Sequence, residues 1–268
     1  MPKQGYERMK LLVTVKTYPT PSQNHVETVC VAGVRLDGPE PSWVRLYPIS
    51  FRAMDYADKF KKWQIVEIDA APRGSYDPRP ESYKPDLESL QLGEAIDTKK
   101  NWTRRRELIG PLLGATTTCD LVAANRAVTM DVGAPSLGLV RPTVTRVELL
   151  PGKDWSRTQL TKVERAAQGD LFTPPLNQLK PVPHRIRYHY HCESPSCDNG
   201  HKQEVLDWEV GSSGHAWQKI YGDLTGQKVL EKWESMVADT KDTYFFIGNQ
   251  HQYRQSFSVL GVWWPKKT

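Results

Sequence analysis

The sequence predicts a mostly β protein with some α-helix, an α+β fold divided into two domains. Short runs of alternating or β-branched residues recur along its 268 residues, and such runs are typical of strands. Twenty prolines and eighteen glycines interrupt these runs, as turns require. The length suits two domains of about 100–150 residues each. The turn sequence Ala134-Pro135-Ser136 marks the expected boundary, which gives domains 1–135 and 136–268.

The first domain begins with strand patterns separated by turn sequences. Apolar and β-branched residues predict strands at 11–16, 27–36, 42–47 and 63–70. A connection rich in proline and charge follows over 72–85 and excludes regular structure there. Apolar residues three or four positions apart then predict helices at 87–96 and 102–113.

The second domain repeats this mixture of strands and short helices. Extended patterns predict strands at 137–149, 185–192, 202–210, 243–248 and 256–264. The polar segment 154–168 is expected to be a helix or a loop, and 172–183 reads as a proline-rich linker. An amphipathic pattern predicts a helix over 227–239.

Composition favours a cytoplasmic protein without a membrane segment. No stretch approaches the roughly 18 uncharged apolar residues that a membrane helix needs, and no signal-peptide pattern is present. Four cysteines in such a setting are expected to be thiols or metal ligands. The net charge of +5 and the 10% of aromatic residues fit a phosphate-rich partner without requiring one.

A cysteine and histidine cluster predicts a metal site in the second domain. Cys192, Cys197 and His201 have C-x4-C-x3-H spacing, and turn residues lie between them. Thiolates and an imidazole are ligands of structural zinc. Asp207 or the distant Cys119 could complete the shell. Two alternatives stay open: a hairpin with free thiols, and a catalytic zinc with three protein ligands and a water.

Basic and aromatic residues alternate on several predicted strands, a pattern that suits nucleic acid. Bases stack on rings while phosphates meet cations. A dense basic run also surrounds the start of the helix predicted at 102–113. The expected contacts are Arg45, Tyr47, Arg52, Arg79, Arg105, Arg187 and His189. The alternative is that the aromatic residues are core and the cations lie on solvated faces.

One acidic pair is a candidate for metal-dependent phosphodiester cleavage. Asp207 and Glu209 are expected on one face of the strand 202–210, where they could hold Mg²⁺. Lys202 falls on the opposite face of that strand, which disfavours a nuclease site and leaves a structural role as the alternative. No phosphate-binding loop or nucleophile elbow is present, so nucleotide hydrolysis and serine-hydrolase chemistry lose support.

Short motifs in both halves resemble bacterial proteins described as dual OB-containing domains. In the first half they are KTYP at 16–19, ETVCVAG at 27–33, WVRLYP at 43–48 and DPRPES at 77–82. In the second half they are RYHYHC at 187–192, LDWE at 206–209 and FFIGN at 245–249. The resemblance implies two OB-like barrels, a zinc-type insertion in the second and an association with bacterial conflict systems. It carries no catalytic residues over to this chain.

Together, these features predict an accessory or sensor protein of a bacterial defence system that binds single-stranded or distorted DNA or RNA. OB barrels bind oligonucleotides on a sheet face between loops. A partner protein from the same defence locus is expected. Two alternatives remain: a metal-dependent nuclease that uses Asp207 and Glu209, and a protein-interaction module that does not bind nucleic acid.

Overall fold

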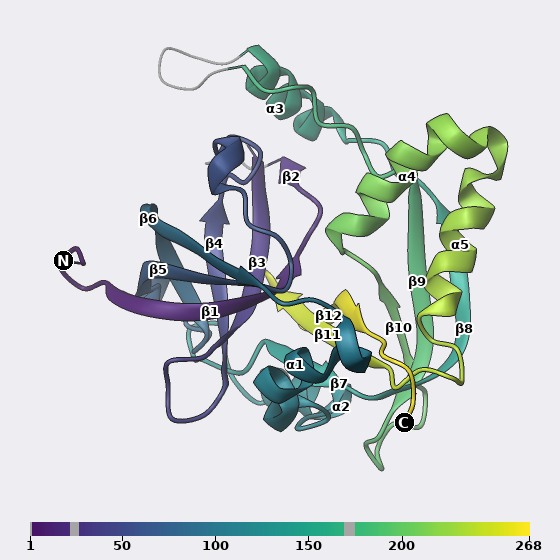
Figure 1. The fold of residues 1–268 in the computed structure, drawn as a ribbon, viewed down its shortest axis with the longest axis horizontal. Helices are drawn as coiled ribbons and strands as arrows, with labels where there is room; N and C mark the ends of the chain where they lie inside the picture. Colours follow the sequence, from purple (N-terminus) through teal and green to yellow (C-terminus); the bar gives the residue numbers. More distant parts are fainter. Residues whose placement is uncertain (1, 22–26, 169–174) are drawn as a thin grey trace.

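The computed structural model describes residues 2–21, 27–168 and 175–268. It is mostly β, with helices beside the strands, as the sequence predicts. Strands of the N-terminal half gather on one side of the molecule, and those of the C-terminal half extend from its centre to the other side (Figure 1). In the part of the chain that is described, no helix combines the length and apolar composition needed to span a bilayer.

A closed five-stranded barrel forms the N-terminal half. Its strands are β1 (Glu7–Lys16), β3 (Glu27–Arg35), β4 (Ser42–Ile49), β5 (Gln64–Pro72) and β6 (Ser82–Ala95). They pair in the circular order β1, β5, β6, β4, β3 and back to β1, and only β4 with β6 is parallel. A short strand, β2 (Thr20–Pro21), pairs with β3. This arrangement is an OB-like barrel.

Strand β1 joins the barrel to the rest of the protein. Met9, Leu11 and Val13 pack in the barrel core. Leu12 lies on the opposite face of the strand, in a cluster with residues of the C-terminal half. Val15 joins the same cluster because the strand register shifts between Val13 and Val15. Because both faces are buried, the residues from Leu11 to Val13 are consecutively apolar and do not alternate with polar residues.

Residues 87–95 of the segment 87–96, which was predicted as a helix, instead belong to β6. This strand pairs along its length with β5, and its first residues also pair with β4. Gly93 permits the close pairing, because an added Cβ there would lie 3.0 Å from the Ile65 carbonyl oxygen. Strand pairing therefore overrides a local spacing that also suits a helix. The neighbouring helix prediction, 102–113, is confirmed in part by α1 (Lys99–Ile109).

Two three-stranded sheets make up the β structure of the C-terminal half among the residues that the structure describes. One sheet contains β7 (Leu137–Val140), β11 (Tyr244–Gln250) and β12 (Tyr253–Trp263), and the other β8 (Pro142–Pro151), β9 (His184–Cys192) and β10 (His201–Glu204). Arg141 alone separates β7 from β8, so the sheets share one extended segment. At the other edge, Val205 forms a parallel bridge with Val259.

In the described part of the chain, four further α-helices accompany these sheets. They are α2 (Thr118–Arg126), α3 (Arg157–Gln168), α4 (Trp208–Tyr221) and α5 (Thr225–Ser235). The prediction of α5 is confirmed, and the segment 154–168, expected to be a helix or a loop, contains a helix. Part of the predicted linker 172–183 lies outside the described residues, and α2 was not predicted.

The predicted strand 202–210 is wrong beyond Glu204, because α4 begins at Trp208. Asp207 is the N-cap, and its carboxylate accepts a hydrogen bond from the Glu209 amide at 3.0 Å. The helix was not predicted because it contains Gly211 and Gly214, and glycine has a low helix propensity. Gly211 is required there, since an added Cβ would clash with the Tyr18 ring.

Candidate functional site

Four side chains from distant parts of the chain meet in a Cys3His cluster. Cys119, Cys192, Cys197 and His201 each present a ligand atom, and these atoms all lie within 4.8 Å of one another. His201 Nε2 is 3.3 Å from both Cys192 Sγ and Cys197 Sγ and 3.6 Å from Cys119 Sγ. Ligands about 2.0–2.3 Å from a tetrahedral zinc would be separated by roughly 3.3–3.8 Å. The cluster could therefore hold a metal ion.

The local structure explains how these ligands come together. Cys192 ends β9, His201 begins β10, and the turn between these paired strands carries Cys197. Gly200 adopts a left-handed φ of 61° at the end of this turn, a conformation that glycine adopts without steric cost. Helix α2 supplies Cys119 from outside the motif.

Of the two residues considered for the fourth position, Cys119 lies in the cluster and Asp207 does not. His189 and His191 also lie outside it. Their ring nitrogens contact Glu148 Oε2 and the Cys197 carbonyl oxygen, each at 2.9 Å. The strand alternation that separates both histidines from Cys192 is therefore confirmed.

Helix α2, and with it Cys119, had a signal in the sequence. Thr117 and Asp120 have capping-box spacing, and each side chain accepts a hydrogen bond from the other residue's backbone amide, at 3.1 and 3.2 Å. A helix start at Thr117 was thus predictable. Its approach to the β9–β10 turn was not, because nothing local specifies that contact.

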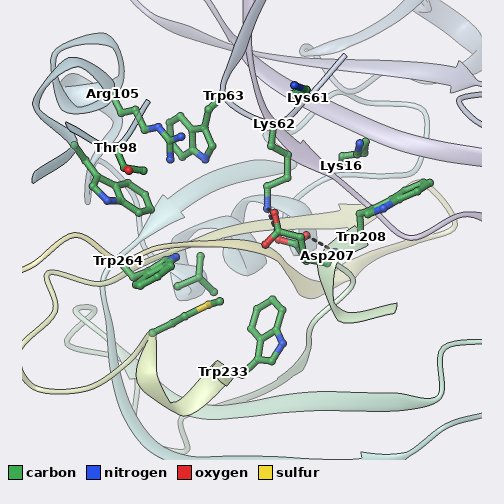
Figure 2. Close-up of a pocket in the computed structure, with 14 residues that line it drawn as sticks. Lys16, Lys61, Lys62, Trp63, Thr98, Arg105, Asp207, Trp208, Trp233 and Trp264 are labelled. Carbon is green, nitrogen blue, oxygen red and sulfur yellow. Dashed lines mark hydrogen bonds and ion pairs between the residues drawn. The ribbon is translucent and has the colours of Figure 1, made fainter. Parts of the chain in front are cut away.

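A pocket with a cavity volume of about 410 Å³ lies between the barrel and the C-terminal half. Figure 2 shows its side chains converging from both halves. Lys16 ends β1, Lys61 and Lys62 precede β5, and Arg105 lies on α1. We call this space, lined also by Asp207, Glu209 and several tryptophans, the interdomain pocket.

A buried ion pair forms one wall of the interdomain pocket. Lys62 Nζ lies 2.7 Å from Asp207 Oδ2 and 3.3 Å from Glu209 Oε1. Burial alone would lower the pKa of Lys62, but the two carboxylates outweigh it and raise the pKa. Both carboxylate oxygens of Asp207 therefore accept hydrogen bonds, Oδ2 from Lys62 Nζ and Oδ1 from the Glu209 amide. A lysine does meet the acidic pair, from the barrel and not from residue 202.

The other three cations have no such partner. Among the described residues, Lys16, Lys61 and Arg105 form no ion pair within 4.0 Å of a carboxylate. Burial, reinforced by the charge of Lys62, lowers the pKa of Lys16 from 10.5 to about 8. Burial likewise lowers the pKa of Arg105 to about 10. The pocket thus keeps positive charge where its environment disfavours it.

Tryptophan rings form the apolar part of the pocket wall. The lining rings are Trp63, Trp102, Trp208, Trp233 and Trp264. The Arg105 guanidinium lies 4.5 Å from the Trp63 ring centroid and 4.8 Å from that of Trp102. Lys16 Nζ lies 4.7 Å from the centroid of Trp208. Cation–π contacts of this kind hold unpaired cations in a partly dry site.

The backbone is strained next to this pocket. In the described chain, the non-glycine residues with positive φ are Trp63, Lys100, Asn101 and Trp102, at 64°, 47°, 53° and 65°. Left-handed backbone costs roughly 1–2 kcal/mol per residue. The Asn101 side chain helps to hold this turn through hydrogen bonds of 2.8 and 2.9 Å with the Lys266 backbone. Strain of this kind concentrates at functional sites.

Two arginines expected to contact nucleic acid are buried between the two halves. Arg45 is 4% exposed and donates to Cys30 Sγ at 2.9 Å and Ser136 Oγ at 3.1 Å. Arg79 is 6% exposed and forms bonds of 2.8 and 2.6 Å with the two carboxylate oxygens of Asp77. Both side chains therefore stabilise the interior. Their contact with nucleic acid stays a prediction.

Four other predicted contacts lie outside the interdomain pocket and have protein partners. Arg187 pairs with Glu148 and Glu204 at 3.3 and 2.8 Å, and His189 contacts the same Glu148. Arg52 pairs with Glu27 at 2.8 Å. Tyr47 is partly buried beneath the Arg73 guanidinium, which lies 5.1 Å from its ring centroid. Of the seven predicted contacts, the interdomain pocket contains Arg105.

The fold and these sites define an α+β protein with an OB-like barrel and a candidate metal centre. The chain belongs to the family described as "Domain of unknown function (DUF8757)", whose model matches residues 114–268, more than half of its length. Residues 7–111 match a second model, "Domain of unknown function (DUF8758)".

Comparisons with other proteins add little to this classification. None of the curated proteins matches the chain. A solved structure described as "Crystal structure of Ifi202 HINa domain in complex with 20bp dsDNA" aligns with 97% of each chain at 9% identity. Its TM-score is 0.31, too low to support an argument about this chain.

Proposed function

We propose that the protein binds single-stranded or distorted nucleic acid at the interdomain pocket. The observation that carries this proposal is the grouping of Lys16, Lys61 and Arg105, cations without a carboxylate partner among the described residues, beside several tryptophan rings. Cations neutralise phosphates, and aromatic rings stack on bases regardless of sequence. A pocket that contains both cations and aromatic rings suits a nucleic acid better than an apolar ligand.

The fold supports the same proposal. OB-like barrels present sheet faces and loops to oligonucleotides. We further propose that the C-terminal half is a second barrel of the same kind. Its strands can be followed in a ring from β7–β8 through β9 and β10, across the Val205–Val259 bridge to β12, then β11 and back to β7. The helices α4 and α5 lie between β10 and β11 in the chain.

We assign zinc to the Cys3His cluster, as a structural ion. Three thiolates and an imidazole complete a tetrahedral shell without an open position for water, as structural zinc sites require. The ion would connect α2 to the β9–β10 turn through Cys119. No catalytic role follows for this centre.

The biological setting is part of the proposal and rests on the resemblance of the sequence motifs. The protein would act in the cytoplasm as an accessory or sensor component of a bacterial defence system, together with a protein encoded at the same locus. We place its two domains at 1–135 and 136–268, although the two family models meet near residue 112.

Binding should be measured first by fluorescence anisotropy, with labelled single-stranded DNA and RNA that carry no terminal phosphate. We expect affinity that weakens steeply between about 50 and 300 mM salt, because phosphate contacts release counterions. Lys61→Gln should lower the magnitude of the salt slope by about one. Lys153→Gln, an exposed lysine outside the pocket lining, is the control for net charge.

Absence of binding at low salt would contradict the proposal and favour the protein-interaction alternative. Strand shortening that requires Mg²⁺ and is lost in Glu209→Gln would support the nuclease alternative instead. Glu209 suits this test better than Asp207, because its side chain is 57% exposed whereas that of Asp207 is 2% exposed and caps α4.

A further inference from the structure

The interdomain pocket has more positive charge than its own acids can balance. Among the described residues that line the pocket, the four cations Lys16, Lys61, Lys62 and Arg105 face two carboxylates, those of Asp207 and Glu209. Asp97, outside the lining, also acts on Arg105 by its charge, but it pairs with Lys99 at 3.2 Å. The formal surplus is two positive charges. Lys62 already occupies both carboxylates at 2.7 and 3.3 Å, so the surplus belongs to the other cations.

Two half-buried members of this surplus, Lys16 and Arg105, are held by rings and by a backbone carbonyl. Lys16 Nζ lies 4.1 Å from the Phe51 ring centroid and 4.7 Å from that of Trp208. Arg105 donates from Nε and from one terminal nitrogen to the Ile96 carbonyl oxygen, at 2.9 and 2.7 Å. An anion in the pocket would supply the charge partner that these contacts do not.

The size and walls of the pocket restrict that anion. A volume of about 410 Å³ lies within the roughly 300–1,000 Å³ range of small-molecule sites. Trp102, Trp208 and Trp264 provide apolar surface beside the cations. A ligand that uses both features carries an aromatic ring and an anionic group on one small framework.

From these observations we infer that the interdomain pocket binds one nucleotide unit that carries a phosphomonoester. A phosphomonoester has a charge of about −1.5 to −2 at pH 7, which matches the surplus of two, whereas an internal phosphodiester carries a single charge. This inference rests on the proposed function and narrows it to a ligand class. The nucleotide could be free in solution or be the phosphorylated end of a strand.

The test compares ligands that differ in one group. AMP, adenosine and inorganic phosphate are titrated into the full-length protein, with binding measured by calorimetry. We expect AMP to bind at least about tenfold more tightly than either fragment, as charge-assisted hydrogen bonds and stacking together predict. Lys16→Gln should weaken AMP binding about tenfold, while Lys153→Gln should leave it unchanged. Equal affinity for AMP and adenosine would overturn the inference.

The pH dependence gives a second readout that does not depend on folding. Lys62, Asp207 and Glu209 are the charged groups that face Lys16, and its pKa is about 8 in the free protein. A bound phosphate favours protonated Lys16 and raises this pKa, so AMP affinity should be constant near pH 7 and fall as the pH passes 8. In Lys16→Arg the side chain stays protonated above pH 8, so AMP affinity should no longer fall over this pH range. An unchanged pH profile in Lys16→Arg would contradict the assigned role.

Oligonucleotides with different ends separate this inference from the proposed function. If a strand with a terminal phosphate binds more tightly than the same strand with a terminal hydroxyl, the bound nucleotide unit is the end of a strand. If AMP binds but strands show no such preference, the ligand is a free nucleotide. Salt-dependent binding of hydroxyl-ended strands, with no preference for a phosphate and no AMP binding, would overturn the inference and leave the proposed function intact. AMP binding without any strand binding would support the inference about the nucleotide and contradict the proposed binding of nucleic-acid strands.

Discussion

Cys119→Ser is expected to abolish stoichiometric metal binding and to lower the free energy of unfolding by several kcal/mol. In structural zinc sites the free energy of metal binding contributes directly to folding, and apparent values reach about 10–16 kcal/mol in small zinc domains. The larger core of this protein should retain part of its stability, so the loss is expected to be smaller. The measurements are metal content by mass spectrometry and chemical denaturation.

Cys30→Ser is the matched control for this substitution. Cys30 lies outside the cluster, and its sulfur accepts a hydrogen bond from Arg45 at 2.9 Å, which a serine oxygen can also accept. It should keep one equivalent of metal and nearly all of its stability. If the two variants retained the same metal content and stability, the assignment of Cys119 as the fourth ligand would be wrong.

Lys62→Met is expected to destabilise the fold by about 3–5 kcal/mol, because it leaves Asp207 buried without its counter-charge. The side chain of Asp207 is 2% exposed, and its Oδ2 lies 2.7 Å from Lys62 Nζ. Lys61→Met removes a lysine of the same pocket that forms no ion pair among the described residues, so it should have little effect on stability. Denaturant unfolding of the two variants measures the difference.

The deficit in Lys62→Met should also depend on pH. Burial already raises the pKa of Asp207 above its ordinary value of 3.8, against the opposing charge of Lys62, and loss of that charge raises it further. A carboxyl with a raised pKa in the folded state stabilises the fold when protonated and loses that contribution as the pH rises. The deficit should therefore be smaller near pH 4 than at pH 7. If the loss of unfolding free energy in Lys62→Met did not depend on pH, it would come from altered packing and not from the charge of Asp207.

The sequence was most informative where local pattern and final environment agree. The barrel strands β1, β3, β4 and β5 were predicted because their apolar residues face a core on at least one side. Strand β6 and helix α4 were mispredicted because pairing with β5 and capping by Asp207 decided their structure. Three of the four cluster ligands followed from their spacing, but the choice of Cys119 depends on tertiary contact.

The interdomain pocket was not predictable from sequence for a related reason. Its charged residues come from β1, the segment before β5, α1 and the start of α4, and no local pattern unites them. Arg105 was expected to contact nucleic acid because it belongs to a dense basic run. Arg45 and Arg79 looked equally suitable, but burial between the two halves distinguishes them from Arg105 in the structure.

The two buried faces of β1 bear on how independent the two family modules are. Leu12 and Val15, with Ala32 and Val34 of the neighbouring strand, form a dry contact with Leu139 and other residues of the C-terminal half. A barrel produced alone would expose this apolar wall to water, and a contiguous patch of that kind promotes self-association. The two modules are therefore expected to be inherited, expressed and unfolded as one unit, although separate sequence models describe them.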